Sequence, residues 1–164
     1  MLRATLLALS LALFAPQVSA DAFEDAFDDA LSAYDRGEFD TVAKTLRKLA
    51  DQGFAPAQSF LGEMYEYGEG VSQNYEEALK WYLLAAEQGD GFGQANIGFM
   101  YDNGFGVAQD NIMARMWYDL ASYNGIDVAE LLSELSARMT VADILKAQAL
   151  AQACMSNGYK NCGY

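Results

Sequence analysis

Apolar residues recur three and four positions apart through most of the chain, the spacing that places side chains on one face of an α-helix. The clearest runs are Ala57, Leu61, Met64 and Tyr65, followed by Ala78, Trp81, Tyr82 and Ala85. Glycines separate these runs, so the chain can reverse direction between them. The pattern therefore predicts an all-α fold built from antiparallel helix hairpins.

The hairpin is repeated. Residues 57–89 match residues 93–125 at an offset of 36 without a gap, and 14 of the 33 positions are identical. One helix pair cannot bury its apolar faces alone, so consecutive copies are expected to stack. The sequence thus predicts an α-solenoid whose central repeats span 54–89 and 90–125.

Two kinds of glycine recur in both copies. Gly68 and Gly89 stand where a helix C-terminus favours a left-handed residue. Gly62 and Gly98 instead lie inside predicted helices, where glycine costs about 1 kcal/mol relative to alanine. We expect a close approach between neighbouring helices at these two positions to offset that cost.

Less regular helical segments flank the two copies. Residues 21–53 predict a degenerate hairpin, and residues 126–164 predict a degenerate repeat followed by a C-terminal capping helix. Thr140 and Asp143 resemble a capping box that would begin this last helix. Its expected inward stripe consists of Val141, Ile144, Leu145, Ala147, Ala151 and Cys154.

The N-terminus has the features of an export signal. Arg3 precedes an apolar run over residues 4–14, and small residues end at Ala20, so we predict a signal peptide over 1–20 and a periplasmic or extracellular protein. A retained membrane anchor is the alternative. The cysteines, Cys154 and Cys162, favour a disulfide in an oxidising compartment, with two free thiols as the alternative.

These residues resemble the Sel-one-like repeat family of the tetratricopeptide superfamily. The matching positions are Ala57, Leu61, Gly62, Tyr65, Gly68, Gly70, Val71, Ala78, Trp81, Tyr82, Ala85, Ala86 and Gly89, with a second copy 36 residues later. In that copy Gly93, Ile97 and Ser122 replace alanine, leucine and alanine. The resemblance implies a right-handed superhelix with a concave face, and a scaffold, adaptor or regulator that binds other proteins.

Charge and composition narrow the classes of partner. The net charge is −13, and it becomes about −14 once Arg3 leaves with the signal peptide. A negative charge of this size repels nucleic acid and anionic membrane surfaces and attracts a basic protein or peptide. The chain has no histidine, which removes the commonest general base and zinc ligand. We therefore expect no catalytic residue, metal or cofactor, and no stable membrane insertion after cleavage.

The resemblance also implies where a partner would bind. If the first helix of each pair lines the concave face, residues between the motif positions form an acidic, aromatic groove. The candidate residues are Tyr34, Asp35, Glu63, Glu66, Tyr67, Phe99, Asp102 and Asn103. Aromatic side chains would supply contact area and carboxylates would attract a basic partner. The alternative is that these residues are a solvated helix face.

Three other functions stay open at this stage. The chain could be an inhibitor or immunity factor for a secreted toxin or hydrolase. Glu63 and Glu66 lie one helical turn apart and could act as the paired acids of a glycosidase, although an open groove lacks the apolar setting that such chemistry needs. A few exported members of the family are penicillin-binding or hydrolytic enzymes, but the chain has no S-x-x-K motif.

Overall fold

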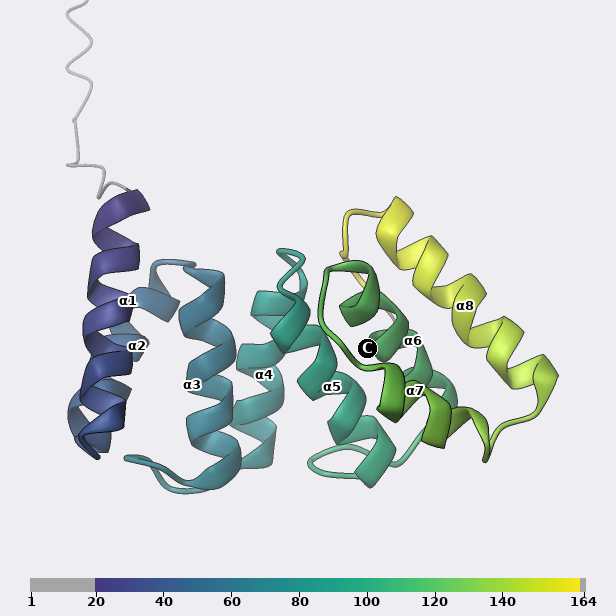
Figure 1. Cartoon of the computed structure of the whole chain (residues 1–164), viewed down its shortest axis with the longest axis horizontal. Coiled ribbons are helices and arrows are strands. Elements are labelled where there is room, and N and C mark those ends of the chain that lie inside the picture. The colour runs from purple at the N-terminus through teal and green to yellow at the C-terminus, as the bar shows by residue number, and fades with distance from the viewer. Residues whose placement is uncertain (1–19, 163–164) are drawn as a thin grey trace, which may run out of the picture.

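The computed structural model describes residues 20–162, and this part of the chain is entirely helical apart from its turns. The helices are α1 (Ala20–Asp35), α2 (Phe39–Asp51), α3 (Ala55–Tyr67), α4 (Tyr75–Ala86), α5 (Gly91–Asn103), α6 (Asn111–Tyr123), α7 (Ala129–Ser136) and α8 (Val141–Ser156). From α1 to α7 each helix packs against the next, in hairpins that follow one another along the long axis of the molecule, and α8 packs on α6 (Figure 1). The predicted all-α solenoid is confirmed. The predicted signal peptide falls almost wholly on residues 1–19, outside the described part.

Matched signals begin and end the helices of the two central repeats. Gly68 and Gly104 take the left-handed conformation at the C-termini of α3 and α5, with φ of 75° and 73°. Asn74 and Asp110 each accept two backbone N–H hydrogen bonds at the start of α4 and α6. The Asn74 and Asp110 side chains satisfy backbone donors that a helix leaves unpaired, and the turn between the two helices begins and ends at equivalent residues in both hairpins.

The two glycines inside helices mark the predicted close approach. A Cβ atom on Gly62 would lie 2.6 Å from the Tyr82 ring, and one on Gly98 would lie 2.6 Å from the Tyr118 ring. Both tyrosines are fully buried. The two helices of each hairpin therefore pack with a ring directly over a glycine, and this confirms the expectation from the sequence.

The buried apolar side chains form three neighbouring clusters. The first joins α1, α2 and α3 and includes Trp81 from α4. The second joins α4, α5, α6 and α8 around Trp117, and the third packs α7 against α5 and α6 through Leu135. The core is thus a continuous layer between successive helix pairs, as stacking of incomplete units requires.

Helix α8 closes the stack. Thr140 accepts a hydrogen bond from the Asp143 backbone N–H, so the predicted N-terminal cap is confirmed. Cys154 and Cys162 form a disulfide with Cα atoms 5.1 Å apart, as predicted. This bond folds the C-terminal turn back, where the Tyr159 hydroxyl donates to the Asn124 side chain at 3.1 Å.

The predicted inward stripe of α8 is partly wrong. Ala147, Ala151 and Cys154 are buried against the second cluster. Val141 and Leu145, however, remain 75% and 60% exposed. The reason is that α8 packs mainly on α6, so its opposite face has no helix of the described chain over it.

Candidate partner-binding groove

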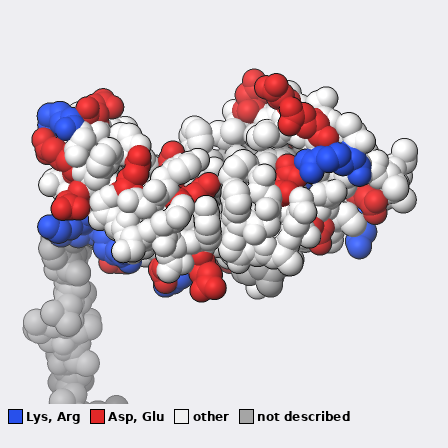
Figure 2. Space-filling view, turned by 90° about the horizontal axis from the view of Figure 1, so that it is seen from below, with Lys and Arg blue, Asp and Glu red and all other residues white. Residues whose placement is uncertain are grey.

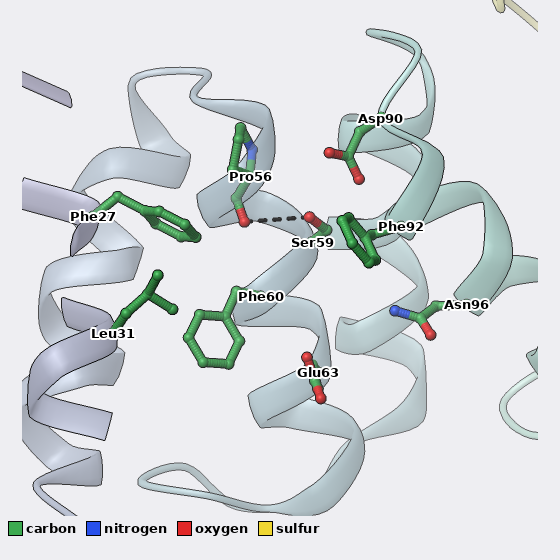
Figure 3. Close-up of a pocket in the computed structure, with 9 residues that line it drawn as sticks. All are labelled: Phe27, Leu31, Pro56, Ser59, Phe60, Glu63, Asp90, Phe92 and Asn96. Carbon is green, nitrogen blue, oxygen red and sulfur yellow. Dashed lines mark hydrogen bonds between the residues drawn. The ribbon is translucent and has the colours of Figure 1, made fainter. Parts of the chain in front are cut away.

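The first helices of three consecutive hairpins, α1, α3 and α5, lie in order and leave a groove of about 360 Å³ between their side chains (Figure 3). The lining residues are Phe27 and Leu31 of α1, Pro56, Ser59, Phe60 and Glu63 of α3, the N-cap Asp90, and Phe92 and Asn96 of α5. Three repeats thus contribute to one site, as expected for recognition on the first-helix face of a solenoid.

The apolar part of the groove has a fixed base and exposed sides. Phe60 is half-buried and packs edge-on against Phe27, with ring centroids 6.2 Å apart. Tyr34 contacts the same ring with a centroid distance of 5.1 Å. Leu31 and Phe92 are 39% and 64% exposed. The groove therefore presents apolar side chains to solvent on both sides of a firmly packed ring.

Two carboxylates lie among these apolar residues. Partial burial raises the pKa of the Glu63 carboxyl, and the nearby charges of Glu66 and Glu69 raise it further. Burial also raises the pKa of the Asp90 carboxyl, although this group accepts a hydrogen bond from the Gly93 N–H at 2.7 Å. A bound cation would stabilise both ionised groups, because each loses hydration in the groove.

Eight residues were predicted for the site, and all eight lie within the described residues 20–162. Of these eight, only Glu63 lines this groove. Tyr34 lies behind it, and its hydroxyl donates to the Glu69 carboxylate at 2.7 Å. That hydrogen bond, with partial burial, raises the pKa of Tyr34 to about 12. Asp35 and Tyr67 are exposed near the ends of α1 and α3.

Glu66 does not lie in an open groove, contrary to the sequence-based placement. Its side chain points into the hairpin, where the residue is 4% exposed and accepts a hydrogen bond from the Tyr82 hydroxyl at 2.7 Å. Burial raises the pKa of the Glu66 carboxyl, and the hydrogen bond from Tyr82 partly opposes this. Glu63 and Glu66 are therefore one turn apart in sequence but in different surroundings.

This burial makes the effect of Glu66→Gln depend on pH. Because the pKa in the folded chain lies above its ordinary value of 4.5, ionisation of Glu66 destabilises the fold as pH rises through the raised pKa. Glutamine keeps an acceptor for Tyr82 and removes the charge. We expect the variant to have a higher free energy of unfolding than wild type at pH 7, with the difference disappearing as pH falls below 4.5. Urea denaturation across this range, with the exposed Glu134→Gln as control, checks it. A variant that is less stable at pH 7 would contradict it.

The second repeat arranges the equivalent residues differently. Asp102, at the position of Glu66, accepts a hydrogen bond from Arg138 at 2.7 Å. The Tyr118 hydroxyl, equivalent to that of Tyr82, is buried without a hydrogen-bond partner in the described chain. Phe99 is half-buried against Phe105, and its carbonyl accepts from the exposed Asn103 side chain. These predicted groove residues are thus used within the fold or lie apart from the groove.

Comparison with known families agrees with this geometry. The family model for the Sel1 repeat matches residues 55–90 and 91–126. The chain contains two Sel1 repeats. Repeats of this family are protein-interaction modules, so we assign this Sel1-repeat chain to the protein-binding class. A comparison with curated proteins finds no match.

Two solved structures resemble this Sel1-repeat protein. One is c5321, a protective antigen of uropathogenic Escherichia coli with an SLR fold, at 26% identity and a TM-score of 0.77 over 85% of this chain. The other is a Sel1 repeat protein from Oxalobacter formigenes, at 32% identity and a TM-score of 0.55 over 66% of this chain. The chain spans 31% and 46% of those two proteins. It therefore corresponds to a portion of each.

Sequence analysis missed every residue of the groove lining except Glu63, including the apolar residues that dominate it. Phe60 and Phe92 occupy positions that the repeat motif leaves variable, and Leu31 lies in the degenerate first hairpin. The motif positions already supply the core of this Sel1-repeat fold. A large apolar residue at a variable position of a first helix is therefore not needed for the core, and this was the available sign of a binding surface.

Charge is unevenly placed on this Sel1-repeat chain. On the face in Figure 2, acidic and uncharged side chains cover the middle of the molecule, and most Lys and Arg lie toward its two ends. No three acidic or cysteine side chains of the described residues gather in a way that could hold a metal ion. Over residues 20–162, no helix has the length and apolar character needed to cross a bilayer.

Proposed function

We propose that the groove between α1, α3 and α5 binds a segment of a partner protein, and that the chain acts as an exported adaptor, scaffold or regulator. The observation that carries this proposal is the exposure of Leu31 and Phe92 on either side of Phe60. Exposed large apolar residues that face one cavity are costly to leave in water and mark interaction sites. The Sel1 repeats of this chain belong to a class of protein-interaction modules, and this supports a protein partner for the groove.

The partner segment should combine apolar and basic residues. Its apolar side chains would cover Leu31 and Phe92, while lysine or arginine would reach Glu63 and Asp90 beside them. Contact with exposed aromatic residues supplies most of the affinity in such sites, and charge pairs mainly set specificity and association rate. The net charge of −13 would further attract a basic partner.

An oxidising compartment suits the C-terminal end of the chain. Cys154 and Cys162 are both 4% exposed and paired, and such bonds form and persist outside the cytosol. Together with the predicted signal peptide, this favours the periplasm or the extracellular space. Mass spectrometry of the protein recovered from the envelope fraction would test both points, by an N-terminus at Asp21 and by the oxidised cysteine pair.

Phe92→Ala tests the groove. We expect it to weaken partner binding by about tenfold or more, because the exposed ring supplies contact area on binding and little to folding. The tagged chain would capture partners from envelope extract, and titration with the recovered partner would give the dissociation constant. Tyr123→Ala, which removes another aromatic residue that is 71% exposed but lies on α6, should leave it unchanged.

The electrostatic part of the proposal has its own test. Glu63→Lys should weaken binding more at low salt than at high salt, whereas Glu63→Gln should have a smaller effect, because screening weakens the interaction between charges. Equal affinity for wild type, Glu63→Lys and Phe92→Ala would place the site on another face. One dominant partner bound tightly enough to block its activity would instead indicate an inhibitor or immunity factor.

A further inference from the structure

The free face of α8 carries a continuous apolar stripe. Val141 and Leu145 are the most exposed large apolar residues of this helix, and Ala149 and Ala153 follow at the same four-residue spacing, also exposed. We call these four residues the outer stripe of α8. The helix lies at the end of the row of hairpins in Figure 1, and the opposite side of it packs on the body of the protein through Ala147 and Ala151. The outer stripe therefore faces away from the stack.

The charge of α8 distinguishes it from the other end of the molecule. Its 16 residues include one acid, Asp143, and one base, Lys146, although the whole chain has 23 acids and 10 bases. Helix α1, at the opposite end, carries six acidic residues and no basic one. Two copies of this acidic chain would repel each other strongly through α1 and much less through α8. The charge distribution thus favours α8 over α1 as the place where a second copy can approach.

The outer stripe is also complementary to itself. Along the helix, the two large side chains of Val141 and Leu145 are followed by the two small side chains of Ala149 and Ala153. When a second α8 lies antiparallel, Val141 faces Ala153 of the second copy and Leu145 faces its Ala149. Each large side chain then meets a small one, and the two-fold axis repeats both contacts. Rows of residues spaced by four form ridges that fit the grooves of a facing helix.

We propose that the outer stripe of α8 binds the same stripe of a second copy, forming a symmetric dimer through antiparallel α8 helices. The contact is confined to one helix from each chain, so it belongs among small, reversible interfaces. The arrangement leaves the groove between α1, α3 and α5 uncovered on both copies. The dimer would present two grooves at once and could bind a partner with two segments more tightly than a single chain does.

Leu145→Lys tests this interface. Sedimentation velocity of the purified chain over a concentration series should show a monomer–dimer equilibrium for wild type, and the variant should dimerise at least about tenfold more weakly because two lysines would meet apolar surface near the axis. Leu84→Lys introduces the same charge at a leucine of α4 that is 40% exposed, and it should dimerise like wild type. Circular dichroism would show that both variants keep the wild-type helical content.

Cross-linking tests the antiparallel register. Chains carrying Leu145→Cys and chains carrying Ala149→Cys, mixed under mild oxidation, should form a mixed disulfide-linked dimer in higher yield than either variant alone. Pairing Leu84→Cys with Ala149→Cys should give none above background. A wild-type chain that stays monomeric throughout the series, or a dimer that Leu145→Lys does not weaken, would overturn the proposal. Equal yields from the single variants and from the mixture would overturn the antiparallel arrangement.

Discussion

Replacing Gly62 by alanine is expected to lower the free energy of unfolding by about 2 kcal/mol, although alanine is the better helix former by about 1 kcal/mol. The new methyl group would lie 2.6 Å from the Tyr82 ring. That ring is fully buried, and its hydroxyl is bound to the Glu66 carboxylate at 2.7 Å. The ring therefore cannot move aside without weakening a buried hydrogen bond. Urea denaturation followed by circular dichroism would measure the loss.

The second repeat supplies the matched comparison. Gly98→Ala creates the same 2.6 Å approach to the ring of Tyr118, but the hydroxyl of that tyrosine has no hydrogen-bond partner in the described chain. Its ring can shift at lower cost, so Gly98→Ala should be the milder of the two variants. An increase in stability for Gly62→Ala would show that the helices separate easily and that the close packing of the hairpin is not required.

Removing the disulfide is expected to destabilise the chain by about 2.5 kcal/mol, because the bond restricts a short loop in the unfolded state. The double variant Cys154→Ala and Cys162→Ala removes the bond without introducing buried hydroxyl groups. Hydrogen exchange should accelerate most in α8 and in the turn that carries Tyr159. That residue has a positive φ of 62°, which is uncommon for a residue other than glycine and adds to the cost of ordering the turn.

Chemical reduction provides the control for the disulfide. Treating the wild-type chain with dithiothreitol should reproduce the loss, whereas the same treatment should leave the double variant unchanged. Urea denaturation and hydrogen exchange of both proteins, with and without reductant, would check this. Equal stability of oxidised and reduced wild type would mean that apolar packing by α8 alone holds the C-terminal end of the stack.

The helix hairpins could be predicted because the same residues recur at one offset. Gly68 and Trp81 recur as Gly104 and Trp117, and each second occurrence is further evidence for the same local structure. The helices and their order could therefore be predicted without knowledge of the contacts between them. The termini of the stack carried weaker signs. The α8 stripe was assigned from apolar spacing, and that spacing alone does not reveal which of two apolar faces meets the core.

The groove was harder to predict because it depends on contacts between hairpins. Projection along a single helix places Glu66 beside Glu63, yet the Tyr82 ring lies over Gly62 and brings its hydroxyl within 2.7 Å of Glu66. That contact depends on a residue 16 positions away in the sequence, and on the absence of a side chain at Gly62, which gives the ring room. The exposed Phe92 was missed for the related reason that an aromatic residue in a helix is usually part of the core.

The chain has two tryptophans, and the fold places one in each half. Trp81 packs with the N-terminal cluster beside the Arg47 guanidinium, and Trp117 lies in the cluster that α8 closes. Replacing either one with phenylalanine would leave a single tryptophan, and its emission, excited at wavelengths that tyrosine does not absorb, would report on one half. Because a stacked array can lose its end units before its centre, the two emission signals would distinguish fraying from one end from a concerted transition of the whole molecule.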